Sequence, residues 1–338
     1  MDYFAQLGTD ARPRLRRSAQ PDWIAPMLAT LTGRRFSDPG WLYERKLDGE
    51  RCLAFHKGPE VRLLSRTRQQ LGRTYPEIAD ALASQDVDDM VVDGEIVAFE
   101  GRRTSFGRLQ QRLGITDPQV ARRSPVRVYY YVFDLLHLDG YDTTALGLRD
   151  RKSLLRQALT FTDPLRFTTH RNTNGEAYFA HACANRWEGV IAKRADAPYV
   201  SRRSGDWLKF KCSAGQEMVI GGFTEPAGSR VGLGALLVGY YDGADLVYAG
   251  EVGTGYSHTT LRDLRRRLDR LETKRSPFRR GRIVERGVHW VHPELVGEVL
   301  FSEWTRDGKL RHPRFVGLRN DKRPRDVVRE RPAGARHA

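Results

Sequence analysis

The segment 46–51, with the sequence KLDGER, has the residue types and spacing for nucleophilic chemistry. A lysine beside a tight turn can attack an electrophile once burial or neighbouring cations have removed its proton. The simpler interpretation is a β-turn made by Asp48 and Gly49, with Lys46 and Arg51 facing solvent. Because so short a motif also arises by chance, its interpretation depends on what the rest of the chain contains.

Six further segments carry charged or aromatic side chains in strand-like surroundings. Glu188 and Lys193 lie at the two ends of a short apolar run, and alternation places Lys209 and Lys211 on one face of a strand. Each segment alone has an ordinary explanation: a surface ion pair, a solvated strand face, a core aromatic for Phe133, or charge in a tail. All of these ordinary explanations would have to be true at the same time, and that requirement argues against them. The segments are SR (65–66), DGEIV (93–97), FDLL (133–136), EGVIAK (188–193), WLKFK (207–211) and RNDK (319–322).

Lysine is scarce in this chain. Of the 57 basic residues nine are lysines, which leaves 48 arginines. Because arginine stays protonated and presents a planar fork, the remaining lysines mark positions where arginine cannot take their place. Five of the nine fall within the segments above, namely Lys46, Lys193, Lys209, Lys211 and Lys322.

The elements that must position these residues fall into two regions of the chain with different patterns of expected strands and helices. From Pro26 to Lys211, strand patterns alternate with a few helical ones out of strict βαβ order, which predicts an α+β domain built on antiparallel sheets. After Lys211, four or five strand patterns and one amphipathic helix, capped by Thr259 or Thr260, are typical of a small OB-type β-barrel. We expect a mobile basic arm (1–20), a first domain (21–213), an OB-fold domain (214–328) and a basic tail (329–338).

The composition indicates a globular protein with a polyanionic partner. The chain has 338 residues, 40% of them hydrophobic, and a formal net charge of +15. No apolar run approaches the ~20 residues of a membrane span, and no apolar signal core follows the N-terminus. Three widely spaced cysteines make a disulfide or a zinc site unexpected and favour a reducing cytoplasm. His289 and His292 have loose metal-like spacing, but a structural role is expected for them.

Taken in order, the seven segments resemble the motifs of the ATP-dependent DNA ligases, within the covalent nucleotidyltransferase superfamily. The sequence around and between these motifs also resembles that of the family, in PMLATL, SFGRLQQRL, FDLLHLDG and LRHPRFVGLRNDK. The resemblance covers about Pro26 to Val328, and it is strongest to the bacterial end-joining ligases: the ligase module of ligase D and stand-alone ligase C. The sequence departs from the family pattern at TRQ, which follows SR (65–66), where the family usually has a nearby glycine.

The resemblance implies a role for each matched residue. Lys46 would attack the α-phosphorus of ATP and become a lysyl-adenylate. Glu44 would face the N6 region of the adenine, and Phe133 would stack on the base. A magnesium ion, or Mn²⁺, would be held by Glu188, Glu95 and Asp48.

The resemblance also implies contacts to the sugar and the phosphates. Glu95 would hold the ribose hydroxyls, while Arg51 and Arg66 would contact ribose and phosphate oxygens. Lys209 and Lys211 would neutralise the α-phosphate as charge develops. The remaining implied nucleotide contacts are Lys193 and, at the departing pyrophosphate, Arg319, Asp321 and Lys322.

The implied reaction seals a 5′-phosphate/3′-hydroxyl break in DNA through lysyl-AMP and a DNA-adenylate. DNA is the expected partner, with salt-dependent affinity for its backbone; a Ku protein and a separate polymerase would come from other chains. Because the sequence contains no polymerase or nuclease segment, we expect a stand-alone monomeric ligase in the bacterial nucleoid, without membrane association. The alternatives are an RNA ligase, a capping-type nucleotidyltransferase and a catalytically inactive DNA-binding relative.

Overall fold

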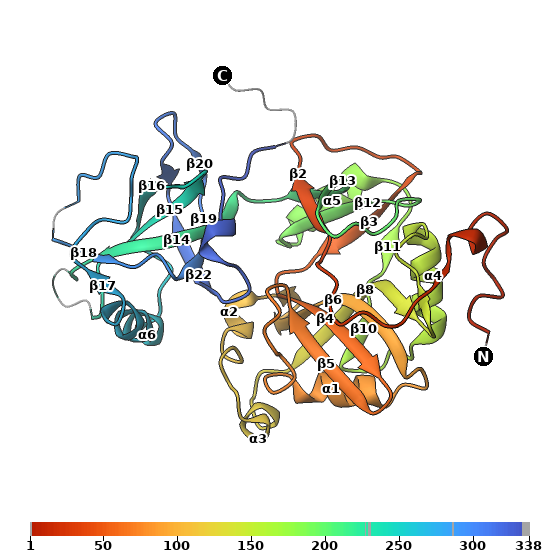
Figure 1. Cartoon of the computed structure of the whole chain (residues 1–338). Helices are drawn as coiled ribbons and strands as arrows, with labels where there is room; N and C mark the ends of the chain where they lie inside the picture. Colours follow the sequence, from red (N-terminus) through yellow and green to blue (C-terminus); the bar gives the residue numbers. More distant parts are fainter. Residues whose placement is uncertain (1, 227, 229–230, 286, 333–338) are drawn as a thin grey trace. The chain divides into compact units, whose positions relative to one another are not determined.

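The computed structural model describes residues 2–226, 228, 231–285 and 287–332. The described residues divide into two compact units, one comprising those up to Cys212 together with Arg331 and Pro332, and the other those within Ser213–Glu330. Strands predominate in both units, with short helices beside them (Figure 1). This composition of elements confirms the α+β class.

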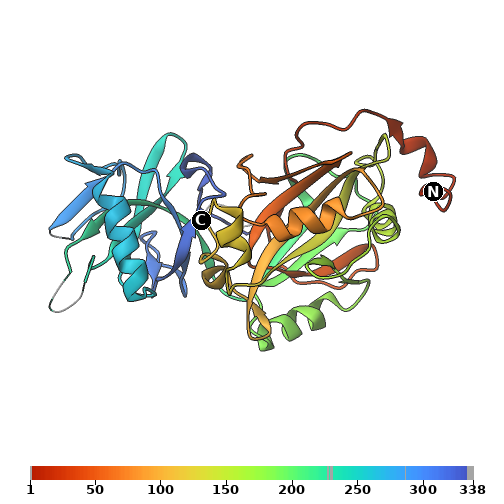
Figure 2. The same ribbon diagram turned by 90° about the horizontal axis from the view of Figure 1, so that it is seen from below.

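An eight-stranded sheet forms the larger part of the first unit. Its strands follow the order β1-β9-β8-β6-β4-β5, with β10 beside β8 and β7 beside β6, and only the β10–β8 pairing is parallel among the pairs described. Helices α1 and α4 pack against β5 and β8 and enclose the main apolar core (Figure 2). The strands are β1 (Arg16–Arg17), β4 (Glu50–Lys57), β5 (Glu60–Ser65), β6 (Asp89–Glu100), β7 (Arg103–Thr104), β8 (Val128–Leu138), β9 (Tyr141–Asp142) and β10 (Leu165–Phe167). The helices are α1 (Pro76–Ala83), α2 (Phe106–Leu109), α3 (Pro118–Arg122) and α4 (Leu148–Ala158).

A second sheet of five strands completes this unit, in the order β11-β3-β12-β13-β2. One of its faces is apolar: Tyr43, Val190 and Phe210 pack there with Tyr178 and Ala182 of helix α5. That face holds the register, because a slip of one residue would turn every side chain to the other side. The elements are β2 (Leu28–Leu31), β3 (Trp41–Lys46), β11 (His170–Arg171), α5 (Gly175–Ala184), β12 (Gly189–Arg194) and β13 (Arg203–Lys211).

A smaller apolar cluster joins the two sheets. Leu53, Phe55 and Phe133 of the eight-stranded sheet pack in it with Trp207 of the five-stranded sheet and with Tyr199. The faces of the two sheets that carry these residues are therefore turned toward each other. Polar residues on the same faces can converge from both sheets.

Among the described residues, the C-terminal unit has a seven-stranded sheet with antiparallel strand pairs, a two-stranded sheet of β20 and β21, and one α-helix. The larger sheet follows the order β16-β15-β14-β18-β17, with β19 beside β14 and β22 beside β19; among the described residues these pairings do not close into a ring. Leu261, Leu264 and Leu268 of α6 are buried, and the helix is capped by Ser257, whose hydroxyl accepts from the Thr260 amide, rather than by either threonine. The elements are β14 (Gly215–Thr224), β15 (Leu236–Asp242), β16 (Asp245–Val252), α6 (His258–Asp269), β17 (Glu272–Thr273), β18 (Val288–Val291), β19 (Val296–Leu300), β20 (Glu303–Trp304), β21 (Leu310–Arg311) and β22 (Arg314–Arg319).

The N-terminal arm differs from its expected mobile state. Strand β1 pairs with β9, and the ring centroids of Phe4 and Tyr141 lie 4.9 Å apart. Leu7 is buried in the main core. The apolar residues between the basic ones therefore anchor the arm to the sheet. The expected basic tail lies, from residue 333 onward, outside the described residues.

None of the helices that the structure describes has the length and apolar character needed to cross a bilayer.

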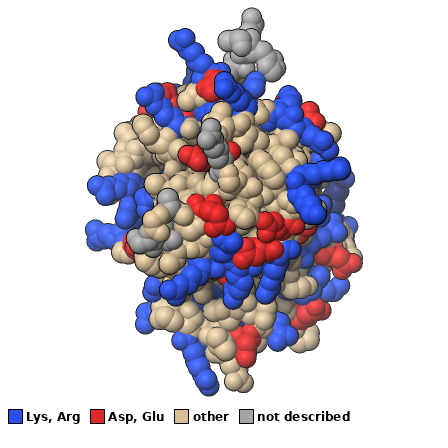
Figure 3. All heavy atoms as spheres, turned by 90° about the vertical axis from the view of Figure 1, so that its left-hand side faces the viewer, with Lys and Arg blue, Asp and Glu red and all other residues tan. Residues whose placement is uncertain are grey.

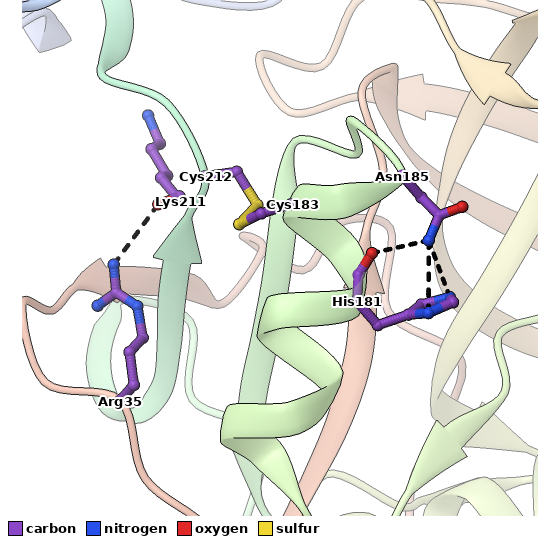
Figure 4. The surroundings of a disulfide bond; sticks show 6 residues. All are labelled: Arg35, His181, Cys183, Asn185, Lys211 and Cys212. Atoms are coloured by element: carbon purple, nitrogen blue, oxygen red, sulfur yellow. Dashed lines mark hydrogen bonds between the residues drawn. A yellow bond between two sulfur atoms is a disulfide. The ribbon is translucent and has the colours of Figure 1, made fainter.

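A disulfide joins Cys183 to Cys212, contrary to the expectation from the cysteine count (Figure 4). Cys183 lies in α5, and Cys212 follows β13 directly. The two cysteines are 29 residues apart in sequence, but the packing of α5 on the sheet brings their Cα atoms to 5.2 Å. The expectation failed because such a pairing depends on that packing and not on cysteine spacing. Cys52 is a buried free thiol.

We expect reduction of this disulfide to destabilise the oxidised protein. Because the bridge spans 29 residues, its loss should lower the free energy of unfolding by about 3 to 4 kcal/mol. Urea unfolding with and without dithiothreitol measures the difference. The double variant Cys183→Ser, Cys212→Ser is the control and should not respond to the reductant. Equal unfolding of the wild type under both conditions, or a thiol assay that finds both cysteines free without reductant, would contradict the bridge.

Candidate active site

Three rows of directly opposed residues cross β3, β12 and β13. In antiparallel pairs such residues project from the same face of the sheet. This face is the one opposite α5, and it collects nearly all of the charged residues predicted on these strands. The rows are Lys46–Gly189–Lys211, Glu44–Ile191–Lys209 and Leu42–Lys193–Trp207.

Two motif glycines allow the backbone to approach closely around this face. A Cβ atom on Gly189 would lie 1.9 Å from the Phe210 carbonyl oxygen, and its φ of +152° disfavours other residues. A Cβ atom on Gly49 would lie 2.2 Å from the Ile96 carbonyl oxygen. The small residue between Lys46 and Lys211 and the turn after Lys46 are thus required by packing.

Lys46 ends β3 and forms an ion pair with Glu188, which directly precedes β12. Both side chains are partly exposed, at 20% of their surface. The predicted nucleophile is therefore reachable and lies beside a carboxylate that the sequence placed in another motif. Because the β3–β12 register puts Lys46 opposite Gly189, the residue after Glu188, this pair is a direct result of strand pairing.

Glu44 is enclosed by two lysines. Its Oε1 lies 2.6 Å from Lys152 Nζ and its Oε2 lies 2.6 Å from Lys193 Nζ, and each of the three side chains is 2% exposed. Burial would raise the pKa of Glu44, but the two ammonium groups outweigh it and lower that pKa below its ordinary value. The carboxylate predicted to face an adenine is thus already engaged. Lys152, which no motif contains, was missed by the sequence reasoning, although the scarcity of lysine was a signal for it.

Arg51 is held on the face of the eight-stranded sheet that looks toward β13. Its guanidinium contacts both carboxylate oxygens of Asp93 at 2.5 Å, and the Tyr199 hydroxyl donates to Asp93 Oδ2 at 2.6 Å. Burial lowers the pKa of Arg51, but Asp93 more than reverses this and the net pKa is raised. Phe133 is 8% exposed, with Arg51 Cζ 4.7 Å and Lys193 Nζ 4.0 Å from its ring centroid. Asp93 and Tyr199 were not singled out from the sequence.

Two other predicted residues of this unit are Glu95, within strand β6, and Arg66, in the turn after β5. Glu95 on β6 pairs in register with Arg51 on β4. Arg66 follows β5 in a turn where Arg68 takes a φ of +67°, a left-handed conformation that glycine adopts more readily than other residues. That turn is closed by Ser65, whose hydroxyl accepts from the amide of Gln69 at 3.0 Å.

Asp48 has a contact that its predicted metal role did not anticipate. Its Oδ2 accepts from the Phe106 amide, at the first residue of α2, at 3.1 Å. Across the residues that the structure describes, no three His, Cys, Asp or Glu side chains form a group that could hold a metal ion. The predicted ligands Glu188, Glu95 and Asp48 are thus not gathered into such a group.

The predicted residues of the C-terminal unit are paired with acidic partners inside that unit. Arg319 binds both carboxylate oxygens of Asp321, at 2.9 and 2.8 Å, and donates to Glu298 at 3.0 Å. Burial would lower the pKa of Arg319, but Asp321 and Glu298 raise it well above its ordinary value. Lys322 Nζ lies 2.9 Å from Glu217 Oε2. The RNDK segment is thus held in place on β14, β19 and β22.

The face drawn in Figure 3 carries charges of both signs. Lys and Arg side chains lie around its rim and below its centre, and Asp and Glu side chains lie among them, several near the centre. In the C-terminal unit Arg265 contacts Glu225 and Asp269, and His289 contacts Glu225 and Glu272. His289 therefore takes part in a surface network of polar contacts with Glu225 and Glu272.

Comparison with known proteins agrees with the geometry. The sequence matches the family described as "ATP dependent DNA ligase domain" over residues 26–211, and the one described as "ATP dependent DNA ligase C terminal region" over 229–322. The multifunctional non-homologous end joining protein LigD of Pseudomonas aeruginosa is 38% identical over 337 residues, 96% of this chain and 39% of that protein. The LigD of Mycolicibacterium smegmatis is 37% identical over 325 residues, 94% of this chain and 41% of that protein. The chain thus spans about two fifths of the length of the curated relatives it matches.

Solved structures show the same relationship. Mycobacterial DNA ligase D complexed with ATP and MES superposes with a TM-score of 0.65 at 36% identity, covering 91% of this chain and 98% of that one. The ligase domain of Mycobacterium tuberculosis LigD superposes with a TM-score of 0.50 at 37% identity, with the same coverage. The motifs, the convergence of their side chains on one sheet face, and these matches lead to one conclusion: the chain belongs to the ATP-dependent DNA ligase family.

Proposed function

We propose that the protein is an ATP-dependent DNA ligase that joins a 5′-phosphate to a 3′-hydroxyl through lysyl-AMP and a DNA-adenylate. The observation that carries the proposal is Lys46, partly exposed and paired with Glu188, on the sheet face that it shares with Lys209 and Lys211. An amine nucleophile surrounded by phosphate-binding cations suits attack on a nucleoside triphosphate. Residues 21–213 would form the adenylation domain and 214–328 the OB-fold domain, in line with the two family matches.

In the first step Lys46 Nζ, once deprotonated, attacks the α-phosphorus of ATP, forms a P–N bond and releases pyrophosphate. Lys209 and Lys211 lie in neighbouring rows of the same face and would offset the negative charge that grows on the α-phosphate. The AMP then passes to the 5′-phosphate of the DNA break. The 3′-hydroxyl displaces AMP, and the strand is sealed.

A divalent cation is proposed at Glu188. Its carboxylate lies beside the nucleophile, where an oxygen ligand and a substrate phosphate could share Mg²⁺ or Mn²⁺. Such an ion supplies charge neutralisation at the phosphates. Glu95 is a second proposed ligand. For Asp48, the contact to the Phe106 amide supports a structural role at the start of α2 instead.

The nucleoside would bind between the facing sheets. Phe133 would stack on the base, Glu95 would hold the ribose, and Arg66 would reach the phosphates. Arg51 and Lys193 already lie over the Phe133 ring, so the stacked base would bind beside these two cations. Glu44 would act through Lys193, because both of its oxygens are engaged. Arg319 and Lys322 are proposed to act on the pyrophosphate.

The cellular role proposed is repair of broken DNA, because the relatives at 37–38% identity are named as non-homologous end joining proteins. Broken duplex DNA would be the partner, with Ku and a polymerase as further ones, and the enzyme would work as a monomer in the bacterial cytoplasm. The DNA substrate supports that location. The cysteine count no longer does, because Cys183 and Cys212 are joined.

Incubation with α-labelled ATP or GTP and Mg²⁺ tests the proposal directly. We expect label bound to the protein from ATP, none from GTP, and none in Lys46→Ala; because the P–N bond of lysyl-AMP hydrolyses in acid, this label should be stable to alkali and lost in hot acid. A nicked duplex with DNA or RNA at the 3′ side of the nick then distinguishes a DNA ligase from an RNA ligase. Label from GTP would favour a capping-type enzyme, and absence of label from ATP would leave an inactive DNA-binding relative.

A further inference from the structure

We infer that Lys152 of α4 is a positioning residue for the nucleotide pocket, which acts through Glu44 to hold Lys193 against the rings of Phe133 and Trp207. The inference rests on the proposed function for its consequence in catalysis, but not for the arrangement itself. Lys152 lies outside all seven motifs, on a helix of the eight-stranded sheet's core. It reaches the five-stranded sheet through its ammonium group.

The contacts of Lys152 are those of a buried, oriented group. Its Nζ donates to Glu44 Oε1 at 2.6 Å and to the Thr168 carbonyl at 2.9 Å, and lies 4.7 Å from the Phe167 ring centroid. A compact ammonium can serve these partners while a second ammonium lies on the other oxygen of the same carboxylate. A planar guanidinium has a different shape and donor geometry. This difference explains why position 152 is a lysine in a chain whose basic residues are mostly arginine.

Lys193 is the group that the arrangement controls. Its Nζ lies 2.6 Å from Glu44 Oε2, 4.0 Å from the Phe133 ring centroid and 4.1 Å from that of Trp207. An ammonium over two aromatic faces is attracted to both, and the attraction grows where water is excluded. Lys152 thereby connects α4 to the aromatic residue proposed to stack on the base.

The charges around Lys193 make the connection measurable. Burial is the main cause that lowers the pKa of Lys193, to about 8; Glu44 opposes this, Lys152 adds to it, and Asp134 opposes it weakly. Two other groups face the cluster: Arg51 lies over the same rings, and the pKa of His170 is lowered by burial and then by Lys152. Since Lys152 and Glu44 act on Lys193 with opposite sign, their removal should shift its titration in opposite directions.

Lysine side-chain NMR on the full chain tests this, because nine lysines give few signals to assign. We expect the pKa of Lys193 to rise in Lys152→Gln, to fall in Glu44→Gln, and to stay near the wild-type value in Lys152→Arg, which keeps the charge. In the wild type the Lys152 signal should also move as Lys193 titrates, because both share Glu44. This last measurement needs no variant and decides the matter if Lys152→Gln does not fold.

Kinetics of lysyl-adenylate formation gives the functional readout. We expect Lys152→Gln to raise the KM for ATP about tenfold while kcat changes by no more than about twofold, because the variant loses binding energy that the ground state and the transition state share. Lys152→Arg should recover part of the lost affinity for ATP. Arg112→Gln is the matched control: Arg112 is also buried, with Glu77 and the Thr74 and Val126 carbonyls as partners, in the same unit. An equal rise in KM in Arg112→Gln, or an unchanged Lys193 titration in Lys152→Gln, would overturn the inference. Absence of label in the wild type would instead overturn the proposed function and leave the titration result standing.

Discussion

Lys46→Arg is expected to abolish formation of the protein–adenylate while the protein stays folded. The reason is chemical: an arginine keeps the positive charge beside Glu188 but does not release a proton to become a nucleophile. The loss should be about 10⁴-fold or more, because a covalent pathway has no substitute in the site. Alkali-stable label bound to the protein from α-labelled ATP measures it.

Lys57→Arg provides the matched control, because Lys57 is an exposed lysine at the end of β4 and lies outside the motifs. It should label like the wild type. Circular dichroism and unfolding of Lys46→Arg should also match the wild type, since its side chain is partly exposed. Adenylation of Lys46→Arg at the wild-type rate would show that another residue carries the AMP.

The second large effect concerns stability. Asp134→Ala is expected to lower the free energy of unfolding by about 3 to 5 kcal/mol, because it leaves a buried guanidinium without its counter-charge. Asp134 and Arg151 are both 0% exposed, and their side chains meet at 2.7 and 3.0 Å. Arg151 also donates to the carbonyls of Leu146, at 2.5 Å, and Ala197, at 3.0 Å. Urea unfolding of the full chain gives the difference.

Two further variants separate the ion pair from a general effect of substitution. Asp134→Leu with Arg151→Met removes both charges and should recover much of the loss, because an apolar pair avoids the desolvation of two ions. Asp80→Ala breaks the exposed pair with Arg122 and should change stability by less than about 1 kcal/mol. If Asp134→Ala unfolds like Asp80→Ala, the buried pair does not stabilise the unit.

Asp93 and Asp134 show that lying within a motif does not specify the role of a residue. Asp93 and Asp134 lie in the segments DGEIV and FDLL, where carboxylates suggest metal or ribose ligands. In the structure Asp93 neutralises Arg51 and accepts from Tyr199, and Asp134 neutralises Arg151. Asp93 thus joins β6 to β4, and Asp134 joins β8 to α4. A sequence motif therefore records structural anchors together with reacting groups.

The sequence by itself determined the family, the α+β class and the strand face that Lys209 and Lys211 share; the pairing of β3, β12 and β13 then placed Lys46 on that face. What the sequence determined follows from local information, since alternation along a strand decides which side chains share a face. The roles proposed for individual site residues remain predictions. Only the tertiary structure decided the partners of Glu44, Arg51 and Asp48, the anchoring of the N-terminal arm and the Cys183–Cys212 bridge. Each of these joins segments distant in sequence, so it depends on packing in space. Lys152 illustrates this difference. The sequence showed that it is one of few lysines, but only the tertiary structure brings it to the buried carboxylate of Glu44.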